Sequence, residues 1–560
     1  MPNHEVTNQV ADLHGYNLLQ SDPGLDNALT ATAHWHWAEL TRFGAELGDA
    51  QFQHLAQLAN RHRPELETHD RSGHRVDQVN FHPAWHTLLT ALRRQGLQAL
   101  PWLLQRPGVH VARTIGYFMQ AQIEAGSLCP TTMTYASIAV LRQEPALYAA
   151  LEAKLLSREH DPRDLPIAQK TSILIGMGMT EKQGGSDVRS NTTLAHPIGF
   201  GGRGEAYALT GHKWFFSAPM CDAHLVLARS EAGLSCFFVP RWRPDGSKNA
   251  VLIQRLKDKL GNCSNASSEV EFDQAFGIMV GPEGRGVPTI IEMANSTRLD
   301  CVIGSAALMR QGLVQALHHA RHRNAFGRPL IEQPLMRNVL CDLALESSAA
   351  TLLMLRLAHA CEDQDAPLER AWRRIVTPAA KFWVCKRAVG FTGECMEVWG
   401  GNGYIETGPM ARLYREAPVN SIWEGSGNLM CLDVLRAVER DPQGLQMLLD
   451  QVAALDATLA SPAQALLDDF NCAPDEREAR ARRLVQRLVL LLQSALLRQH
   501  APGAVADAFA HSRCAAPNSS VSAASEAALY GQVYGSLPPS LLQAEMQEQI
   551  LQYVWNTKPL

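Results

Sequence analysis

The sequence predicts an α+β protein whose strands are confined to the middle of the chain. Apolar residues recur at three- and four-residue spacing, which is typical of helices, before residue 177 and again after residue 286. Between these regions, short alternating runs bounded by Gly, Asn, Asp and Pro are typical of strands. No helical pattern of about 10–15 residues separates one strand from the next, so we expect an antiparallel sheet or a small barrel rather than βαβ units.

The composition is that of a folded protein. Of 560 residues, 46% are hydrophobic and 19% are charged, which excludes a wholly disordered chain. The net charge of −5 excludes a basic coat for nucleic acid over the whole chain, but not a local basic patch. No apolar run reaches about 18 residues and the N-terminus lacks the features of a signal peptide, so we expect a cytoplasmic protein that makes no contact with a membrane. The 12 cysteines include no C-x-x-C pair, so we expect reduced thiols and no metal site.

The first half of the chain divides into two predicted domains. Residues 1–176 form an N-terminal helical domain, and residues 177–286 form a middle β domain. The expected helices are Ala38–Asn60, Ala84–Gln95 and Arg106–Val140. The expected strands are Ala206–Phe216, Ala223–Arg229, Leu234–Val239 and Ser268–Phe272.

The helical period returns in the second half. Residues 287–440 form a predicted helical bundle domain, and residues 441–560 form an extra, mostly helical C-terminal region. The expected helices are Asp300–Arg323, Pro334–Cys361, Trp372–Glu397, Leu429–Val438, Glu476–Gln499 and Leu541–Trp555. The block 400–427, with many Gly, Asn and Pro residues, and the Ser/Ala/Pro-rich run 501–528 are expected to be loops.

A polar loop at Met179–Val188 joins the first helical region to the strands. Gly184 and Gly185 allow the backbone to approach a ligand closely, and Thr180 and Ser186 supply hydroxyl groups. Such a loop can hold a phosphate, a ribityl chain or a ring edge, but its composition also fits an ordinary capped turn. It is not a dinucleotide-binding fingerprint, because the spacing G-x-G-x-x-G fails.

Three further motifs admit two interpretations each. The aromatic strand His212–Ser217 can pack on a flat cofactor, although such residues more often belong to the core. Arg323, just before a helix stop at Gly327, can bind a diphosphate or carry an ordinary solvated charge. Glu424 lies between a tryptophan and a Gly-Ser-Gly turn, where it can serve as a base, whereas most single glutamates are surface charges.

Taken in order, the motifs resemble the acyl-CoA dehydrogenase flavoprotein family. They read T-E-x-x-G-G-S-D, W-F-F-S, R-x-x-F-G, G-G-x-G-Y and W-E-G-S, and the resemblance covers about residues 80–440. Within the family, the chain most resembles the branch that acts in the adaptive response to DNA alkylation. That closer resemblance lies in Met177–Asp187, Gly211–Phe216, Val419–Gly427 and the C-terminal region 441–560.

The resemblance implies FAD as the cofactor and an acyl-CoA dehydrogenase-like order of helical, β and helical domains. Glu424 would be the catalytic base, which removes the α-proton of an acyl thioester while a hydride leaves the β-carbon for flavin N5. Arg323 and Gly400 would reach the FAD of a neighbouring subunit, which implies a homo-oligomer built as a tetramer. The implied cofactor-binding residues are Met179, Thr180, Gly185, Ser186, Val188, Trp214, Ser217, Arg323, Phe326, Gly400, Gly401, Ile422, Trp423, Gly425, Ser426 and Asn428.

The sequence departs from the family pattern at three places. Trp423 replaces the usual tyrosine before the glutamate, which crowds the expected pocket. Glu397 stands where many members have glutamine, and Lys182-Gln183 replaces the common Pro-x after T-E. These departures put the ordinary acyl-CoA substrate in doubt, but they do not affect the expectation of FAD.

The C-terminal region carries a cluster of arginines. At about 100° per residue, Arg480, Arg483 and Arg487 share an arc of about 60° on one helix, beside an apolar arc that can dock. This arginine ridge can bind phosphates, or it can be a solvated charged face. The region holds eight Lys and Arg against twelve Asp and Glu, which favours the solvated face. The resemblance implies double-stranded DNA, bound without sequence preference, as the partner.

Three functions remain open at this point. The first is a flavoprotein that binds DNA and limits alkylation damage, with weak acyl-CoA dehydrogenase chemistry. The second is a metabolic acyl-CoA dehydrogenase of fatty or branched-chain acyl groups, with a structural tail. The third is a flavin-containing scaffold without catalysis, which the intact Glu424 argues against.

Overall fold

The computed structural model describes residues 5–514 and 533–555 of the chain. The chain forms two compact units. The β unit comprises Gln51–Val109 and Ile123–Asp300, and the helical unit comprises Met1–Ala50, His110–Gln122 and Cys301–Leu560. Helix α9, Gly286–His322, runs from the β unit into the helical unit. The predicted α+β class, with its strands gathered in the middle of the chain, is confirmed.

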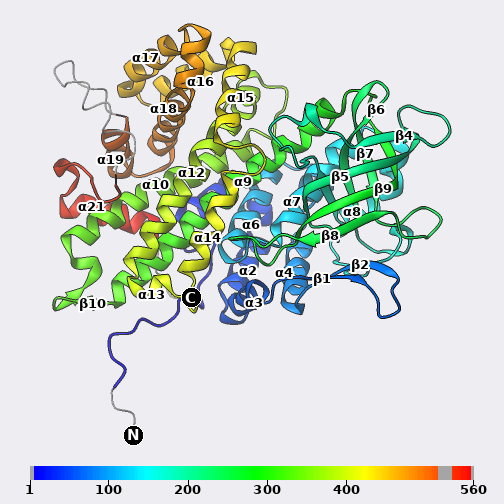
Figure 1. The fold of residues 1–560 in the computed structure, drawn as a ribbon. Coiled ribbons are helices and arrows are strands. Elements are labelled where there is room, and N and C mark those ends of the chain that lie inside the picture. The colour runs from blue at the N-terminus through cyan, green and yellow to red at the C-terminus, as the bar shows by residue number, and fades with distance from the viewer. Residues whose placement is uncertain (1–4, 515–532, 556–560) are drawn as a thin grey trace. The chain divides into compact units, whose positions relative to one another are not determined.

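Seven strands form the main sheet of the β unit (Figure 1). They are β3 (Ile175–Gly178), β4 (Leu194–Pro197), β5 (Ala206–Ser217), β6 (Ala223–Ser230), β7 (Gly233–Pro240), β8 (Val251–Leu256) and β9 (Ser267–Val280). The order is β3-β6-β4-β5-β9-β7, with β8 paired to β9 and a further pairing of β6 with β7. Strands β6, β4, β5, β9 and β7 therefore close a ring around an apolar core that includes Leu209, Phe216 and Phe237.

Two pairings correct the prediction of a purely antiparallel sheet. β3 pairs with β6 in parallel along its whole length, and β4 meets β6 in parallel at Leu194 and Arg229. The other pairings of this sheet are antiparallel. Parallel neighbours need a crossover connection, which is usually helical. Here strands β4 and β5 supply the crossover between β3 and β6, so the absence of an intervening helical pattern does not exclude a parallel pair.

A small hairpin corrects the prediction that residues 1–176 are helical throughout. β1 (Glu65–His69) pairs with β2 (Arg75–Asn80), and Asp70 accepts hydrogen bonds from the backbone N–H groups of Ser72 and His74 in the turn. Both strands alternate between more and less exposed residues, but each is too short to stand out between helices. The helices of the β unit are α3 (Ala50–Arg61), α4 (Pro83–Arg94), α5 (Leu100–Leu103), α7 (Leu128–Leu141) and α8 (Pro145–Leu156).

The helical unit is a bundle around the long helix α10, Pro334–His359. Its other helices before the C-terminal region are α1 (Pro23–Ala33), α2 (Trp37–Gly48), α6 (Val109–Ile123), α11 (Pro367–Ala371), α12 (Thr377–Val398), α13 (Gly401–Tyr404), α14 (Met410–Asn420) and α15 (Gly427–Arg440). Helices α13 and α14 correct the prediction that 400–427 is a loop. Met410, Leu413 and Ala417 are buried at helical spacing, a signal that the surrounding glycines and prolines obscure.

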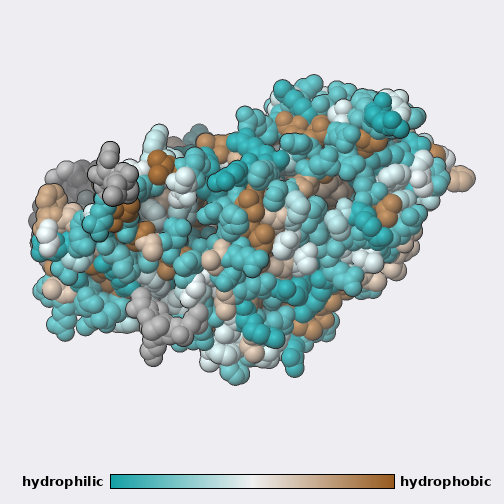
Figure 2. Space-filling model, turned by 90° about the horizontal axis from the view of Figure 1, so that it is seen from below, coloured by the Kyte–Doolittle hydropathy of each residue, from teal (hydrophilic) through white to brown (hydrophobic). Residues whose placement is uncertain are grey.

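Helix α10, Pro334–His359, has the length and apolar composition of a membrane-spanning helix. However, 94% of its apolar stretch is buried inside the protein, which is typical of a core helix. Figure 2 shows one face of the molecule, on which hydrophobic residues form small separate groups among hydrophilic ones. All 12 cysteines are free thiols, and nine of them are buried.

The C-terminal region is built into the bundle. Its helices are α16 (Pro442–Leu455), α17 (Ala460–Phe470), α18 (Pro474–His500), α19 (Gly503–Arg513) and α21 (Ala544–Val554), and α18 packs against α10, α12 and α15 (Figure 1). Helix α19 corrects the prediction of a loop over 501–528, the rest of which lies largely outside the described residues. Arg513 of α19 forms buried ion pairs with Asp342 and Glu346 of α10, so this helix is anchored in the core.

Candidate functional site

The loop at residues 179–191, here called the flavin loop, leaves strand β3 and closes on itself. The backbone N–H of Trp214 donates to the Thr180 carbonyl at 2.9 Å, and the Asn191 amide donates to the Met179 carbonyl at 2.8 Å. A Cβ atom at Gly185 would lie 2.5 Å from the Thr180 hydroxyl oxygen, so this close turn requires glycine. The structure thus brings Met179, Thr180, Gly185 and Trp214 close together.

A buried ion pair between Glu181 and Lys213 stabilises the flavin loop. Glu181 and Lys213 are 1% and 0% exposed, and their Oε1 and Nζ atoms are 2.8 Å apart. The Glu181 carboxylate also accepts hydrogen bonds from the backbone and hydroxyl groups of Thr192 and Thr193. Burial alone would raise the pKa of Glu181, but Lys213 and these donors outweigh it and bring the pKa to about 2. Burial lowers the pKa of Lys213 to about 8.

A buried histidine holds the end of strand β5. The His224 ring nitrogen Nε2 lies 3.1 Å from the Ser217 carbonyl, the ring stacks on Phe216 at 3.8 Å, and it fills the space that a side chain at Gly176 would need. Burial lowers the pKa of His224 to about 3, so the neutral ring donates to that carbonyl. Ala218 then turns with φ of 50°. Sequence reasoning missed His224 and the Glu181–Lys213 pair because their partners come from different strands.

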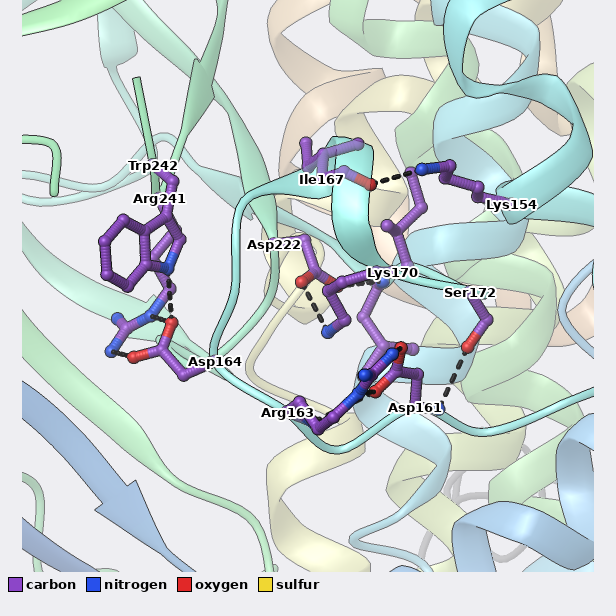
Figure 3. Close-up of polar contacts among 12 residues, drawn as sticks. Lys154, Asp161, Arg163, Asp164, Ile167, Lys170, Ser172, Asp222, Arg241 and Trp242 are labelled. Atoms are coloured by element: carbon purple, nitrogen blue, oxygen red, sulfur yellow. Dashed lines mark hydrogen bonds and ion pairs between the residues drawn. The ribbon is translucent and has the colours of Figure 1, made fainter. Parts of the chain in front are cut away.

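The segment that leads from α8 to β3 is fixed by contacts between charged side chains (Figure 3). Asp164 accepts hydrogen bonds from Arg241 at 3.0 Å and from the Trp242 indole at 2.7 Å. Lys170 and Asp222, 7% and 5% exposed, pair at 2.6 Å. These contacts tie the segment to the ends of β6 and β7, so the start of β3 and the loop after it have a defined position.

The donor groups of the β unit suit a flavin. The hydroxyl groups of Thr180, Ser186 and Ser217 make no hydrogen bond to any other residue in the described part of the chain. Gly184 adopts φ of 121°, which leaves the backbone of the loop open to close approach. Free hydroxyl groups beside an open backbone and a tryptophan can meet the polar edge and ribityl chain of FAD. The residues present therefore fit the cofactor that the sequence predicts.

In the helical unit, Glu424 lies in a tight turn between α14 and α15. It is half-buried and adopts φ of 59°, a left-handed conformation that is uncommon for a residue with a side chain. The Lys381 ammonium, on α12, donates to the Trp423 carbonyl at 2.7 Å and also to the Gly425 carbonyl. The Trp423 indole donates to Asn420 at 3.0 Å. We call residues 422–426 the Glu424 turn. Lys381 binds two carbonyls of this turn, and the sequence did not indicate this role.

The other predicted flavin contacts of the helical unit lie at the opposite end of α12. The Cys385 thiol donates a hydrogen bond to the Cys301 carbonyl, and the Trp399 indole donates one to the Gln315 carbonyl. Since both contacts advance along α9 and α12 together, the two helices run side by side in the same direction. Arg323 directly follows α9, and Gly400, with φ of 59°, lies two residues after the end of α12. Lys381 and Trp399 are separated by about 27 Å along the helix axis, at 1.5 Å per residue. Arg323 and Gly400 are therefore far from the Glu424 turn of the same chain.

The N-terminal segment contacts this far end. The Asn8 side chain donates to the Asn324 carbonyl and accepts from the Asn324 N–H, both at 2.8 Å, and Arg323 donates to the Asn8 carbonyl. Asn402, beside Gly401, donates to the Gln9 side chain at 3.2 Å. Between these contacts, Phe326 is 97% exposed at the tip of the β10–β11 hairpin, Asn324–Ala325 and Arg328–Pro329. Nothing in the sequence indicated that residues 8 and 9 would lie here.

The arginine ridge is formed, but acidic residues offset part of its charge. Arg480 pairs with Glu476 at 3.2 Å and lies 3.9 Å from Asp469 of α17, and Arg487 pairs with the same aspartate. Arg483 is exposed. Arg482, on another face of α18, donates to the Asn428 side chain at 2.8 Å and so reaches the start of α15. In residues 5–514 and 533–555, no three His, Cys, Asp or Glu side chains gather as a metal site.

Three family models match the chain in succession. Residues 8–162 match the adaptive response protein AidB N-terminal domain, residues 176–275 the acyl-CoA dehydrogenase middle domain, and residues 284–439 the acyl-CoA dehydrogenase C-terminal domain. The putative acyl-CoA dehydrogenase AidB of Escherichia coli is 51% identical over 440 residues, which cover 78% of this chain and 81% of that protein. The chain belongs to the acyl-CoA dehydrogenase family. Because members of this family bind FAD, FAD is the cofactor.

A further sequence relative and two solved structures are also similar to this member of the acyl-CoA dehydrogenase family. Acyl-CoA dehydrogenase family member 11 of Caenorhabditis elegans is 31% identical over 71% of this chain and 66% of that protein. The solved structure of Bd2924 in its apo form has a TM-score of 0.81 at 27% identity, covering 88% of this chain and 99% of that one. The structure of Caenorhabditis elegans ACDH-11 with C11-CoA has a TM-score of 0.80 at 24% identity, covering 100% of this chain and 94% of that one, and shows the shared fold.

Proposed function

We propose that the protein is an FAD-dependent dehydrogenase of acyl thioesters in which Glu424 is the base. The observation that carries this proposal is the left-handed turn that presents Glu424, clasped by a buried lysine on α12. A carboxylate removes a weakly acidic α-proton only when it is held close to the carbon and shielded from water. Bound FAD would accept the hydride from the β-carbon. The C11-CoA complex of the Caenorhabditis elegans relative supports acyl-CoAs as the ligands to test.

Replacing Glu424 with glutamine tests the base. The amide keeps the size of the side chain, so FAD should stay bound with an unchanged visible spectrum. Reduction of the flavin by a panel of straight-chain and branched acyl-CoAs should slow by about 100-fold, which corresponds to about 2.7 kcal/mol of barrier. Stopped-flow absorbance of the bound flavin measures the rate. A slowing of less than about tenfold would place the base on another residue.

We further infer that the protein is a homo-oligomer, a tetramer as in our sequence-based prediction. Arg323 and Gly400 lie at the end of α12 remote from the Glu424 turn, so in a neighbouring subunit they are better placed for the adenosine end of the cofactor. The nearly fully exposed Phe326 also favours a surface that another copy covers. Sedimentation of the FAD-loaded protein should show an oligomer. A monomer with full FAD occupancy would contradict this arrangement.

A second candidate function is protection of duplex DNA from alkylation. Two observations favour it: the match of residues 8–162 to the adaptive response AidB N-terminal domain, and the exposed position of Arg483 on the arginine ridge. Contacts to phosphates would be independent of sequence and would weaken with salt. Asp469 opposes this function, because it draws the charges of Arg480 and Arg487 toward α17.

Two variants with opposite expected effects on affinity test DNA binding by the ridge. Replacing Arg480, Arg483 and Arg487 with alanine should reduce the slope of log affinity against log salt by about two to three units, near 0.9 per lost contact. Replacing Asp469 with asparagine should strengthen binding, because it frees two arginines. Fluorescence anisotropy of labelled duplex DNA measures both effects. Unchanged affinity and slope in both variants would mean that the ridge does not bind DNA.

A further inference from the structure

Lys381 is a buried charge in the helical bundle. Its side chain is 1% exposed, and its described hydrogen-bond partners are two backbone carbonyls, those of Trp423 and Gly425. Burying an ammonium group is costly unless its partners compensate it, and an apolar residue of similar size usually serves a core as well. We therefore infer that the charge of Lys381 has a structural role at these two carbonyls.

The two carbonyls bracket Glu424 and Gly425: that of Trp423 belongs to the peptide before Glu424, and that of Gly425 belongs to the peptide after Gly425. Holding both of them fixes the two ends of this short segment, and with them the direction of the Glu424 side chain. A residue with a Cβ atom stays in the left-handed region only where its surroundings impose that conformation. Glu424 adopts φ of 59°, and Gly425 follows with φ of 106°. Lys381 supplies the constraint from one point on α12, a rigid element.

We propose that Lys381 is a positioning residue that holds Glu424 in the orientation needed to take a proton from the substrate. The proposal deepens the function proposed above and rests on it. Lys381 acts through the backbone of the Glu424 turn and does not itself reach the substrate. Loss of the ammonium would release the turn. The Glu424 carboxylate would remain present, but it would no longer be oriented toward the proton of the substrate.

The first test replaces Lys381 with methionine, which keeps the length of the side chain. The maximal rate of flavin reduction by acyl-CoA should fall at least tenfold, while the dissociation constant of the acyl-CoA changes little. Hydrogen exchange of the backbone over residues 422–427 should speed up. The matched control is Arg310→Met, which removes another buried cation that donates to two backbone carbonyls, those of Val554 and Ser21. It should lower stability without faster exchange in residues 422–427 or slower reduction per bound flavin.

A double-mutant cycle tests the same proposal through stability alone. Replacing Glu424 with glycine removes the cost of the left-handed conformation, so Lys381→Met should destabilise an E424G background less than the wild type. Equal destabilisation in both backgrounds, or unchanged exchange in residues 422–427, would overturn the proposal. A double variant that folds when Lys381→Met alone does not would support it. If Glu424→Gln leaves flavin reduction intact, the base assignment fails, whereas exchange and the cycle still report on the turn.

Discussion

Replacing Lys213 with methionine should lower the free energy of unfolding of the protein by about 3–5 kcal/mol and release FAD. The change leaves the Glu181 carboxylate, which is 1% exposed, without its cation. It also removes the donor at 2.8 Å from the Leu227 carbonyl. Because Glu181 fixes residues 192 and 193, which directly follow the flavin loop, the loop should loosen as the pair is lost. Denaturant unfolding and the absorbance of bound flavin measure the two effects.

The control for this prediction removes both charges. The double variant E181Q/K213M should recover part of the lost stability, since a neutral amide is far less costly to bury than an unpaired carboxylate. It should not recover FAD affinity fully, because the amide cannot accept as many hydrogen bonds from Thr192 and Thr193 as the carboxylate does. A single variant within about 1 kcal/mol of wild type would show that the pair is dispensable.

The second large effect should follow from replacing Arg513 with methionine, also about 3–5 kcal/mol. Arg513 contacts Asp342 and lies 3.3 Å from Glu346, and these carboxylates are 7% and 3% exposed. Arg387 of α12 remains beside Glu346 at 3.1 Å, but Asp342 would lose its cation. Helix α19 should then detach from α10. Denaturant unfolding measures the cost, and limited proteolysis near residue 513 reports the detachment.

Arg337→Met is the matched control for Arg513. Arg337 also joins α10 to the C-terminal region, through Glu548 at 3.0 Å, but the two side chains are 21% and 52% exposed. Exposed pairs contribute between zero and about 1 kcal/mol, so this variant should stay close to wild type. Equal costs for the two variants would mean that burial does not distinguish the contacts, contrary to the argument for Arg513.

The parts of the site that depend on neighbouring residues in the chain were predictable from sequence. The flavin loop, with Thr180 and Gly185, and the glycine-containing turn at Glu424 are encoded by short motifs whose conformations are local. The order of helical and β regions followed from hydrophobic periodicity in the same way. The assignments of individual FAD contacts and of the arginine ridge to DNA stay predictions.

Features that join distant segments were not predictable. Lys381 and the Glu424 turn are more than 40 residues apart, and Asp469 opposes Arg487 from a separate helix. The parallel pairing of β3 with β6 also arises between segments that two strands separate. A single sequence shows which residues can be charged or apolar, but it does not show which buried charges meet. Such pairings are decided by the packing of whole elements.

Helix α12 sets the distance between the Glu424 turn and the glycines that follow the end of the helix. Lys381, near its start, is proposed to position the proton acceptor of its own subunit, and the glycines after its end are proposed to complete the cofactor site of a neighbour. Inserting one residue into α12 would turn one end relative to the other by about 100° and shift it by about 1.5 Å. The length of this helix would therefore be under tighter constraint than its composition, since no local repacking restores both phase and distance.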